Sequence, residues 1–335
     1  MSRYPNRNST GGRFHLAVFI CMTFWVVMLS VPDSSQGQSI PENDREYRLW
    51  YSGFDARSSA MANANAADPF DLNGFYSNPA IPVFSNNSAS FISNSLYNPG
   101  RGIMLENLTF SLGRSTSHHL AAGATIQSSM LNEKLYYGPN HMQFTQIDLA
   151  LGYSWSIFRS LSAGASVQSF YGKTASSEVW TYNASAGLLY VPSSLISYGL
   201  VYKGTAITEG RMGAKPVYIL TEENETVVAG VYAPHRLEVG LTLRFPSLAK
   251  YPDFLLSVSN EKIFGTDGLI YKAGMEVYVQ NFLALRGGYF YSPFAEGGRL
   301  GAGLMLNAFR LDYAFVPGDI DLNGTSHQVS ISLGF

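Results

Sequence analysis

The residues of this sequence that could do chemistry are mainly charged side chains separated by an even number of positions in otherwise uncharged segments. Arg236, Glu238 and Arg244 show this spacing in one segment, and Lys272 and Glu276 show it in another. Residues two apart in a strand share a face, so such charges would gather on one side of a sheet. The set expected to point inward is Arg236, Glu238, Arg244, Lys272, Glu276, Arg286, Arg299, Arg310 and Asp312. These charges could form cross-strand ion pairs or line a path for a solute, and their spacing leaves both roles open.

Patterns typical of enzymes and metal sites do not occur in the sequence. His118 and His119 are adjacent, so their side chains would diverge on a strand and would not bind one metal ion. We find no nucleophile motif, phosphate-binding loop or paired-histidine spacing, and no Gly-x-Ser-x-Gly setting supports a catalytic role for His327. The single cysteine, Cys21, lies in the amino-terminal apolar segment. We therefore predict no enzyme activity, no cofactor and no metal site.

The elements that would position the charges are strands with strict alternation. Between Arg236 and Phe245, every odd-numbered residue is apolar and the even-numbered ones are Arg, Glu, Gly, Thr and Arg. From His327 to Phe335, Gln, Ser and Gly alternate with mainly apolar residues in the same way. A soluble β-sandwich would carry Lys, Glu and Arg on its outer faces, whereas the polar faces here are mostly small and uncharged. The pattern favours an all-β fold, a transmembrane antiparallel β-barrel with apolar side chains facing lipid.

The composition points the same way. Charged residues make up 14% of the chain, against about 25% in typical soluble proteins. The chain is rich in aromatic side chains, with 21 Tyr and 21 Phe, and it contains 32 Gly. A formal net charge of −2 gives no electrostatic reason to expect a nucleic-acid partner.

Alternating segments separated by turn residues predict 14 strands, an even number that lets a barrel close with both ends on the periplasmic side. The longest connection, 204–234, would be an outer hairpin with short strands at Val217–Leu220 and Thr226–Tyr232. The terminal Phe335 is typical of the insertion signal of outer-membrane proteins. The predicted strands are 88–96, 106–113, 118–128, 142–156, 161–172, 178–191, 195–203, 235–246, 253–261, 268–280, 282–291, 298–306, 308–316 and 326–335.

The amino-terminal residues predict a secretory signal peptide over 1–37. Arg3, Arg7 and Arg13 precede a nearly continuous apolar run from Phe14 to Val31, and small polar residues follow up to Gly37. The alternative is a transmembrane anchor, because the run is close to the minimum length of a membrane span. Removal of 1–37 would leave a barrel domain over 88–335 and an additional segment over 38–87.

Segment 38–87 is too long for a simple linker, and we predict that it forms a hatch or plug inside the lumen. It has an Ala-rich stretch with helix potential from Arg57 to Ala67, which Asp68-Pro69 would end. Asn78-Pro79-Ala80 would form a turn before the first strand. Loose coil cannot lie against lipid, which favours a position inside the barrel. The alternative is a disordered periplasmic tail. We expect Arg57 to pair with one of the inward acids Glu238, Glu276 or Asp312.

Short segments spread over the mature chain also carry a family resemblance. They are Ala56–Ala64 followed by Asp68 and Asn78-Pro79-Ala80, then Ala233–Leu237 with Val239-Gly240-Leu241, and finally Leu311–Phe315 with Pro317, Gly324-Thr325 and His327. Together they resemble the PorV/PorQ-like proteins, within the wider FadL-like group of 14-stranded barrels with an amino-terminal hatch. The chain departs from that pattern at Ala62 and Asn63, where the hatch normally has paired glycines, and at the inserted Ser326.

This resemblance implies a non-enzymatic component of the type IX secretion system in the outer membrane. Its partners would be outer-membrane lipid, the secretion translocon and the carboxy-terminal sorting domains of cargo, bound through outer loops such as 204–234. The wider FadL-like group implies an alternative, a transporter that passes small hydrophobic compounds through an opening in the barrel wall. A structural barrel or simple porin is a third hypothesis.

Overall fold

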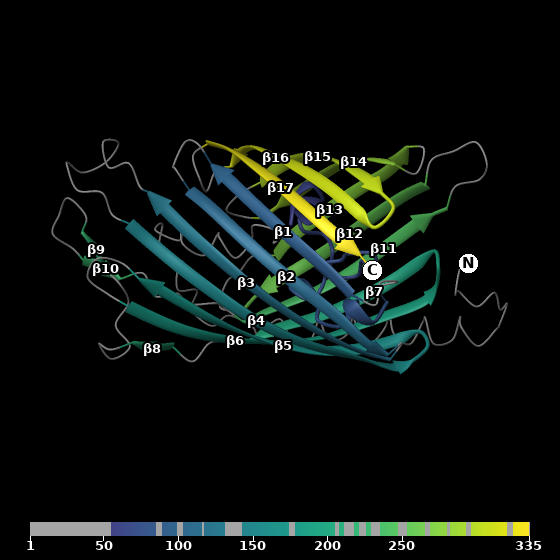
Figure 1. The fold of residues 1–335 in the computed structure, drawn as a ribbon, viewed down its shortest axis with the longest axis horizontal. Coiled ribbons are helices and arrows are strands. Elements are labelled where there is room, and N and C mark those ends of the chain that lie inside the picture. Colours follow the sequence, from purple (N-terminus) through teal and green to yellow (C-terminus); the bar gives the residue numbers. More distant parts are fainter. Residues whose placement is uncertain are drawn as a thin grey trace.

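The computed structural model describes most of the chain after residue 54 and is shown in Figure 1. The predicted signal peptide 1–37, residues 38–54 and the terminal Phe335 lie outside the described residues. The described ranges are 55–84, 89–98, 103–115, 117–130, 143–173, 178–204, 208–210, 218–220, 226–228, 235–246, 253–264, 269–279, 282–292, 296–319 and 324–334.

Fourteen long strands form one closed antiparallel wall (Figure 1). Each strand pairs with its neighbours in the wall, and β1 closes the ring by pairing with β17. The fourteen predicted strands are confirmed, with ends that differ by at most three residues. The strands are β1 (Ala89–Asn98), β2 (Ile103–Ser115), β3 (His118–Met130), β4 (Gln143–Phe158), β5 (Leu161–Lys173), β6 (Glu178–Ser193), β7 (Ile196–Gly204), β11 (Arg236–Phe245), β12 (Asp253–Ile263), β13 (Leu269–Val279), β14 (Leu283–Tyr291), β15 (Glu296–Leu306), β16 (Phe309–Asp319) and β17 (Gly324–Gly334).

The side chains of the wall alternate between an exposed apolar outer face and a buried inner face. On β4, Leu149 and Leu151 are 55% and 63% exposed, whereas Ala150 between them is 2% exposed. On β17, Ser330 and Ser332 are buried and Ile331 is exposed. A closed wall with apolar side chains outside and small polar ones inside is the architecture of bacterial outer-membrane barrels. The predicted fold class and outer-membrane location are thus confirmed. Among the described residues, no helix has the length and apolar character of a membrane span.

Three short strands lie in the long connection between β7 and β11, grouped at the left end of the barrel in Figure 1. β9 (Tyr218–Leu220) and β10 (Thr226–Val228) pair as the expected hairpin, although each is shorter than predicted. β8 (Thr208–Gly210) was not predicted, and it pairs with the outer part of β6. Among the described strands β6 is the only one that pairs with β8, so β8 is hydrogen-bonded to the wall along one edge.

Residues 55–84, here named the hatch segment, lie against the inner face of the wall. The segment has two short helices, α2 (Ala56–Ala60) and η2 (Ile81–Phe84). The Ala-rich stretch was expected to be helical as far as Ala67, but the helix ends at Ala60. Ala62 and Asn63 adopt positive φ angles of 55° and 58°, and this left-handed backbone conformation terminates the helix. Glycine adopts such angles most easily, and neither position carries one.

Candidate functional site: the hatch segment and the inner wall

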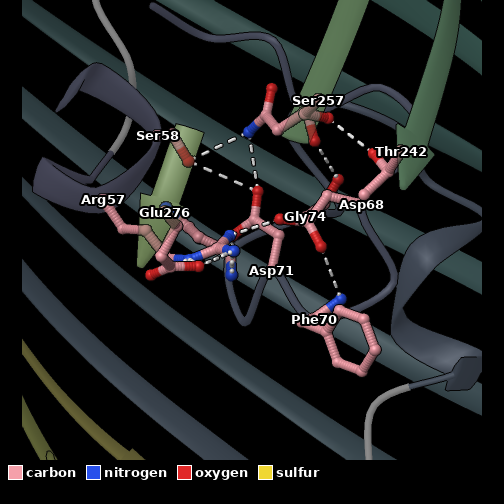
Figure 2. Close-up of polar contacts among 12 residues, drawn as sticks. Arg57, Ser58, Asp68, Phe70, Asp71, Gly74, Thr242, Ser257 and Glu276 are labelled. Atoms are coloured by element: carbon pink, nitrogen blue, oxygen red, sulfur yellow. Dashed lines mark hydrogen bonds and ion pairs between the residues drawn. The ribbon is translucent and has the colours of Figure 1, made fainter. Parts of the chain in front are cut away.

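Arg57 joins the hatch segment to the wall through buried ion pairs. Its Nη1 donates to Asp68 within the hatch segment at 2.5 Å, and its Nη2 donates to Glu276 on β13 at 2.6 Å (Figure 2). Burial disfavours the charge of Arg57, but the two carboxylates outweigh that effect and hold the guanidinium pKa well above its ordinary value. Of the three acids considered as partners, Glu276 is the one that Arg57 contacts, and Asp68 is a second partner.

Glu276 is also the centre of a charged cluster on the wall. Its Oε1 accepts a hydrogen bond from Arg286 Nε at 2.6 Å, and Tyr278 donates to its Oε2 at 2.8 Å. Asp312 lies 2.8 Å from Arg286 and 2.6 Å from Arg310. With Arg57 and Asp68, the cluster holds three arginines and three acids, so its formal charges cancel. Removing one partner from such a buried set typically costs about 3–5 kcal/mol, because it leaves an uncompensated charge.

A second luminal cluster lies on β11, β12 and β13. Lys272 Nζ donates to Glu261 at 2.5 Å and to Glu238 at 3.1 Å, while Arg236 lies 3.2 Å from Glu261. Glu261 completes this cluster, and the sequence analysis did not include it among the inward charges. Glu261 lies on the inward-facing side of β12, directly opposite Glu238 in the β11–β12 pair. The pairing of these two strands was the signal that could have identified it.

Two further predicted inward charges contact the hatch segment. Arg244 pairs with Asp253 at 2.7 Å, and its guanidinium lies 4.5 Å from the centre of the Phe70 ring. The Arg299 side chain reaches the carbonyl of Ser59 at 3.5 Å. All nine charges predicted to face inward are thus buried or partly buried on the inner face, and they belong to β11 and β13–β16.

Within the hatch segment, the carboxylate of Asp71 is held by Asn65 at 2.7 Å and by the Ser58 hydroxyl at 3.3 Å (Figure 2). Ser58 also donates its backbone N–H to Asp55, the residue that caps α2. Burial raises the pKa of Asp71 to about 7, and the nearby charge of Asp55 adds to the rise while Arg57 opposes it. Asp71 is a feature of the site that the sequence analysis did not identify.

Asn78 and Pro79 place the end of the hatch segment against the wall. The Asn78 side chain donates to the carbonyls of Ala66 at 2.8 Å and Leu188 at 3.1 Å, and it accepts a hydrogen bond from the Ala80 N–H at 3.0 Å. The first of these bonds ties two parts of the hatch segment together, and the second ties it to β6. The predicted turn is therefore also a point of attachment.

Glycines on the inner face allow this close approach. A Cβ added to Gly164 would overlap the carbonyl of Pro79, and one added to Gly199 would overlap the carbonyl of Ala66. Since such contacts occur on β3–β7, β11 and β13–β15, the hatch segment fits the lumen through contact with glycine backbone on nine of the fourteen strands. The wall glycines whose added Cβ would meet the hatch segment are Gly123, Gly152, Gly164, Gly187, Gly199, Gly240, Gly274, Gly288 and Gly301.

The inner face of β2–β4 has a different chemistry. Asn107 donates to Thr125 at 2.7 Å and to the hydroxyl of Tyr76 at 3.2 Å. Asp148 is directly opposite Thr125 in the β3–β4 pair, is 2% exposed, and has no hydrogen-bond partner for either carboxylate oxygen. Burial raises the pKa of Tyr76, and the charge of Asp148 adds to the rise. Sequence reasoning missed Asp148 because a lone acid in an alternating strand gives no distinct signal.

The histidines considered in the sequence, His118, His119 and His327, lie at separate positions of the wall. His118 is exposed and His119 is buried, so the two imidazoles diverge as predicted. His327 lies at the outer surface, where its Nδ1 is 2.8 Å from the hydroxyl of Tyr313. The described part of the chain contains no group of three or more His, Cys, Asp or Glu side chains arranged to hold a metal ion.

Comparison with known proteins finds similarity in structure alone. No protein family matches the sequence, and no curated protein does. The CymD monoaromatic hydrocarbon channel has a TM-score of 0.58 at 11% identity, covering 85% of this chain and 98% of that one. The Ralstonia pickettii toluene transporter TbuX has a TM-score of 0.60 at 12% identity, covering 85% of this chain and 99% of that one. A Pseudomonas aeruginosa FadL homologue has a TM-score of 0.53 at 12% identity, covering 85% of this chain and 98% of that one. This confirms the FadL-like fold, whereas the PorV/PorQ subgroup stays a prediction.

Proposed function

We propose that this chain is a non-enzymatic transporter that passes small hydrophobic compounds across the bacterial outer membrane. The observation that carries the proposal is the contact between the hatch segment and glycines on nine strands around the ring. A segment held in this way obstructs an aqueous path along the barrel axis. An apolar solute has another route, because it can leave through the wall into lipid, whereas a polar solute cannot.

Two further observations support transport of apolar compounds. The barrels of similar fold described above are, by their names, a monoaromatic hydrocarbon channel and a toluene transporter. In this chain, the described ladder is one-sided at β8, which pairs with β6 and with no other described strand. β6 thus changes partner along its length, from β7 to β8, and this change of partner is our candidate for the exit.

Uptake measurements test this proposal. The chain would be expressed in the outer membrane of a host that takes up toluene slowly, and uptake of labelled toluene would be compared with uptake of a pentose. We expect faster uptake of toluene and unchanged uptake of the pentose, because the hatch segment obstructs the polar route. A variant lacking residues 55–84 serves as the control and should admit the pentose. Equal stimulation of both solutes by the intact chain would contradict the proposal.

A second candidate function is the role implied by the PorV/PorQ resemblance, as an interaction partner in type IX secretion. The specific observation in its favour is the β9–β10 hairpin, which gives the long connection an ordered element at one end of the barrel. Its partners would be the translocon and the sorting domains of cargo.

Purification from intact outer membranes separates the two candidates. Recovery of a large translocon or a cargo sorting domain with the wild-type chain, and its loss on deletion of residues 218–228, would support the secretion role. Recovery of the chain with lipid alone, together with toluene uptake, would support transport.

A further inference from the structure

Asp148 is the most unusual polar residue of the described inner wall. It is 2% exposed, and neither of its carboxylate oxygens has a hydrogen-bond partner. Buried carboxylates are normally paired or hydrogen-bonded, because desolvation without compensation is costly. The other buried acids of the wall meet this rule, since Glu238, Glu261, Glu276 and Asp312 all lie within ion-pair distance of a cation.

The polar neighbours of Asp148 are bonded to one another and leave it out. Asn107 donates to Thr125 and to Tyr76, and Thr109 donates to Asn107 at 2.9 Å. Thr125 is the direct cross-strand neighbour of Asp148. Side chains in this relation lie about 5 Å apart at Cβ, so the carboxylate borders a satisfied hydrogen-bonded group without taking part in it.

Among the side chains that the structure describes, no cation of the wall forms an ion pair with Asp148. Among the described side chains of β1–β6, it is the only buried Asp, Glu, Lys or Arg. The buried cations belong to β11, β13, β14 and the hatch segment, where each of them already lies beside a carboxylate. The neighbouring charge that would balance Asp148 must therefore come from a proton or from a ligand.

Aromatic and apolar side chains surround the next inward residue of the same strand. Ala150, the next inward residue of β4, packs with Phe75, Tyr76 and Ala121. The Phe75 and Tyr76 rings are 4.1 Å apart between centroids. The combination of an unpaired carboxylate with aromatic rings suits an organic ammonium group, which aromatic faces attract and a carboxylate neutralises.

We propose that Asp148, together with Tyr76 and Phe75, forms a luminal binding site for small aromatic or aliphatic compounds that carry a protonated amine. This inference rests on the proposed function, since it names a substrate class for the same barrel. Asp148 accepts hydrogen bonds from the ammonium group, and the rings of the hatch segment contact the apolar part. Binding requires neighbouring side chains to shift, because both carboxylate oxygens are buried.

Binding measurements on the full chain in detergent test the site, with benzylamine, benzyl alcohol and toluene as probes at neutral pH. We expect the wild type to bind benzylamine at least about tenfold more tightly than benzyl alcohol. Asp148→Asn should remove this preference, so that benzylamine and benzyl alcohol bind with similar affinity. Glu106→Gln is the matched control, because it removes one negative charge from an exposed position on β2, and it should behave as the wild type does.

The outcomes separate this site from the proposed function. Equal affinities for benzylamine and benzyl alcohol in the wild type would overturn the site, whether or not Asp148→Asn folds. Infrared difference spectra give a second readout, since benzylamine should perturb a carboxyl band that Asp148→Asn lacks. Toluene uptake without amine binding would leave transport standing and the site refuted. Amine binding through Asp148 without toluene uptake would leave the site standing and transport refuted.

Discussion

The two sides of the inner wall hold the hatch segment by different means. On β13–β16, Arg57 enters a cluster of paired charges around Glu276. Glycine contacts occur on both sides, and on β3–β7 they are accompanied by alanine and by neutral hydrogen bonds such as that from Asn78 to Leu188. A charged cluster fixes position strongly, because breaking one pair leaves a buried charge. Contacts with small neutral residues are individually weaker, so we infer that the hatch segment is anchored on the first side and can shift on the second.

The largest effect should follow from loss of the anchor. Arg57→Ala leaves Glu276 and Asp68 without a shared partner, and we expect it to destabilise hatch docking by about 3–5 kcal/mol. Limited proteolysis of the folded barrel should then cleave within residues 55–84 much faster than in the wild type. Arg159→Ala, at the exposed turn after β4, is the control. Unchanged protection in Arg57→Ala would mean that the cluster does not anchor the segment.

A methyl group on the second side should have the next largest effect. In Gly199→Ala the new Cβ would overlap the carbonyl of Ala66, so the hatch segment must move away. Overpacking of this kind typically costs about 1–3 kcal/mol. Gly287→Ala is a matched control, because a Cβ there would meet no atom within 4 Å. The measurement is again proteolysis, and equal cleavage of the two variants would show that the close contacts do not restrain the segment.

A pH dependence should come from Asp71. Its pKa is raised to about 7 in the folded chain, chiefly by burial, from about 3.9 when unfolded. The folded form therefore holds the proton more tightly, and this contribution is fully present below about pH 4 and is lost as the pH rises through 7. Asp71→Asn should flatten the decline of hatch protection between pH 4 and 7. A wild-type chain whose protection rises over that range would contradict this assignment.

The smallest effect should be a gain in stability. Ala62 has a φ of 55°, an angle that glycine adopts without the steric penalty of a Cβ. Ala62→Gly should therefore stabilise the turn after α2 by up to about 1 kcal/mol, less the added entropy of the unfolded chain. Slower proteolysis of the hatch segment would report this gain. Faster proteolysis would mean that packing of the Ala62 methyl outweighs backbone strain.

The sequence was most informative about the wall and least informative about the hatch segment. Alternation depends only on which side of a strand meets lipid, so it located the fourteen strands of the wall and nine inward charges, although it did not single out Glu261. The end of α2 depends on positive φ angles at Ala62 and Asn63, which neither residue type requires. Asp71 and Asp148 owe their character to burial by distant residues. The sequence shows that the chain is rich in glycine. Predicting which glycines contact the hatch segment would have required the register of every strand.

The central claim is that the hatch segment obstructs the barrel axis, and conductance in planar bilayers tests it most directly. The wild-type chain should insert without steady ion conductance, and deletion of residues 55–84 should produce steady open channels. Steady conductance of the intact chain, equal to that of the deletion variant, would contradict the claim.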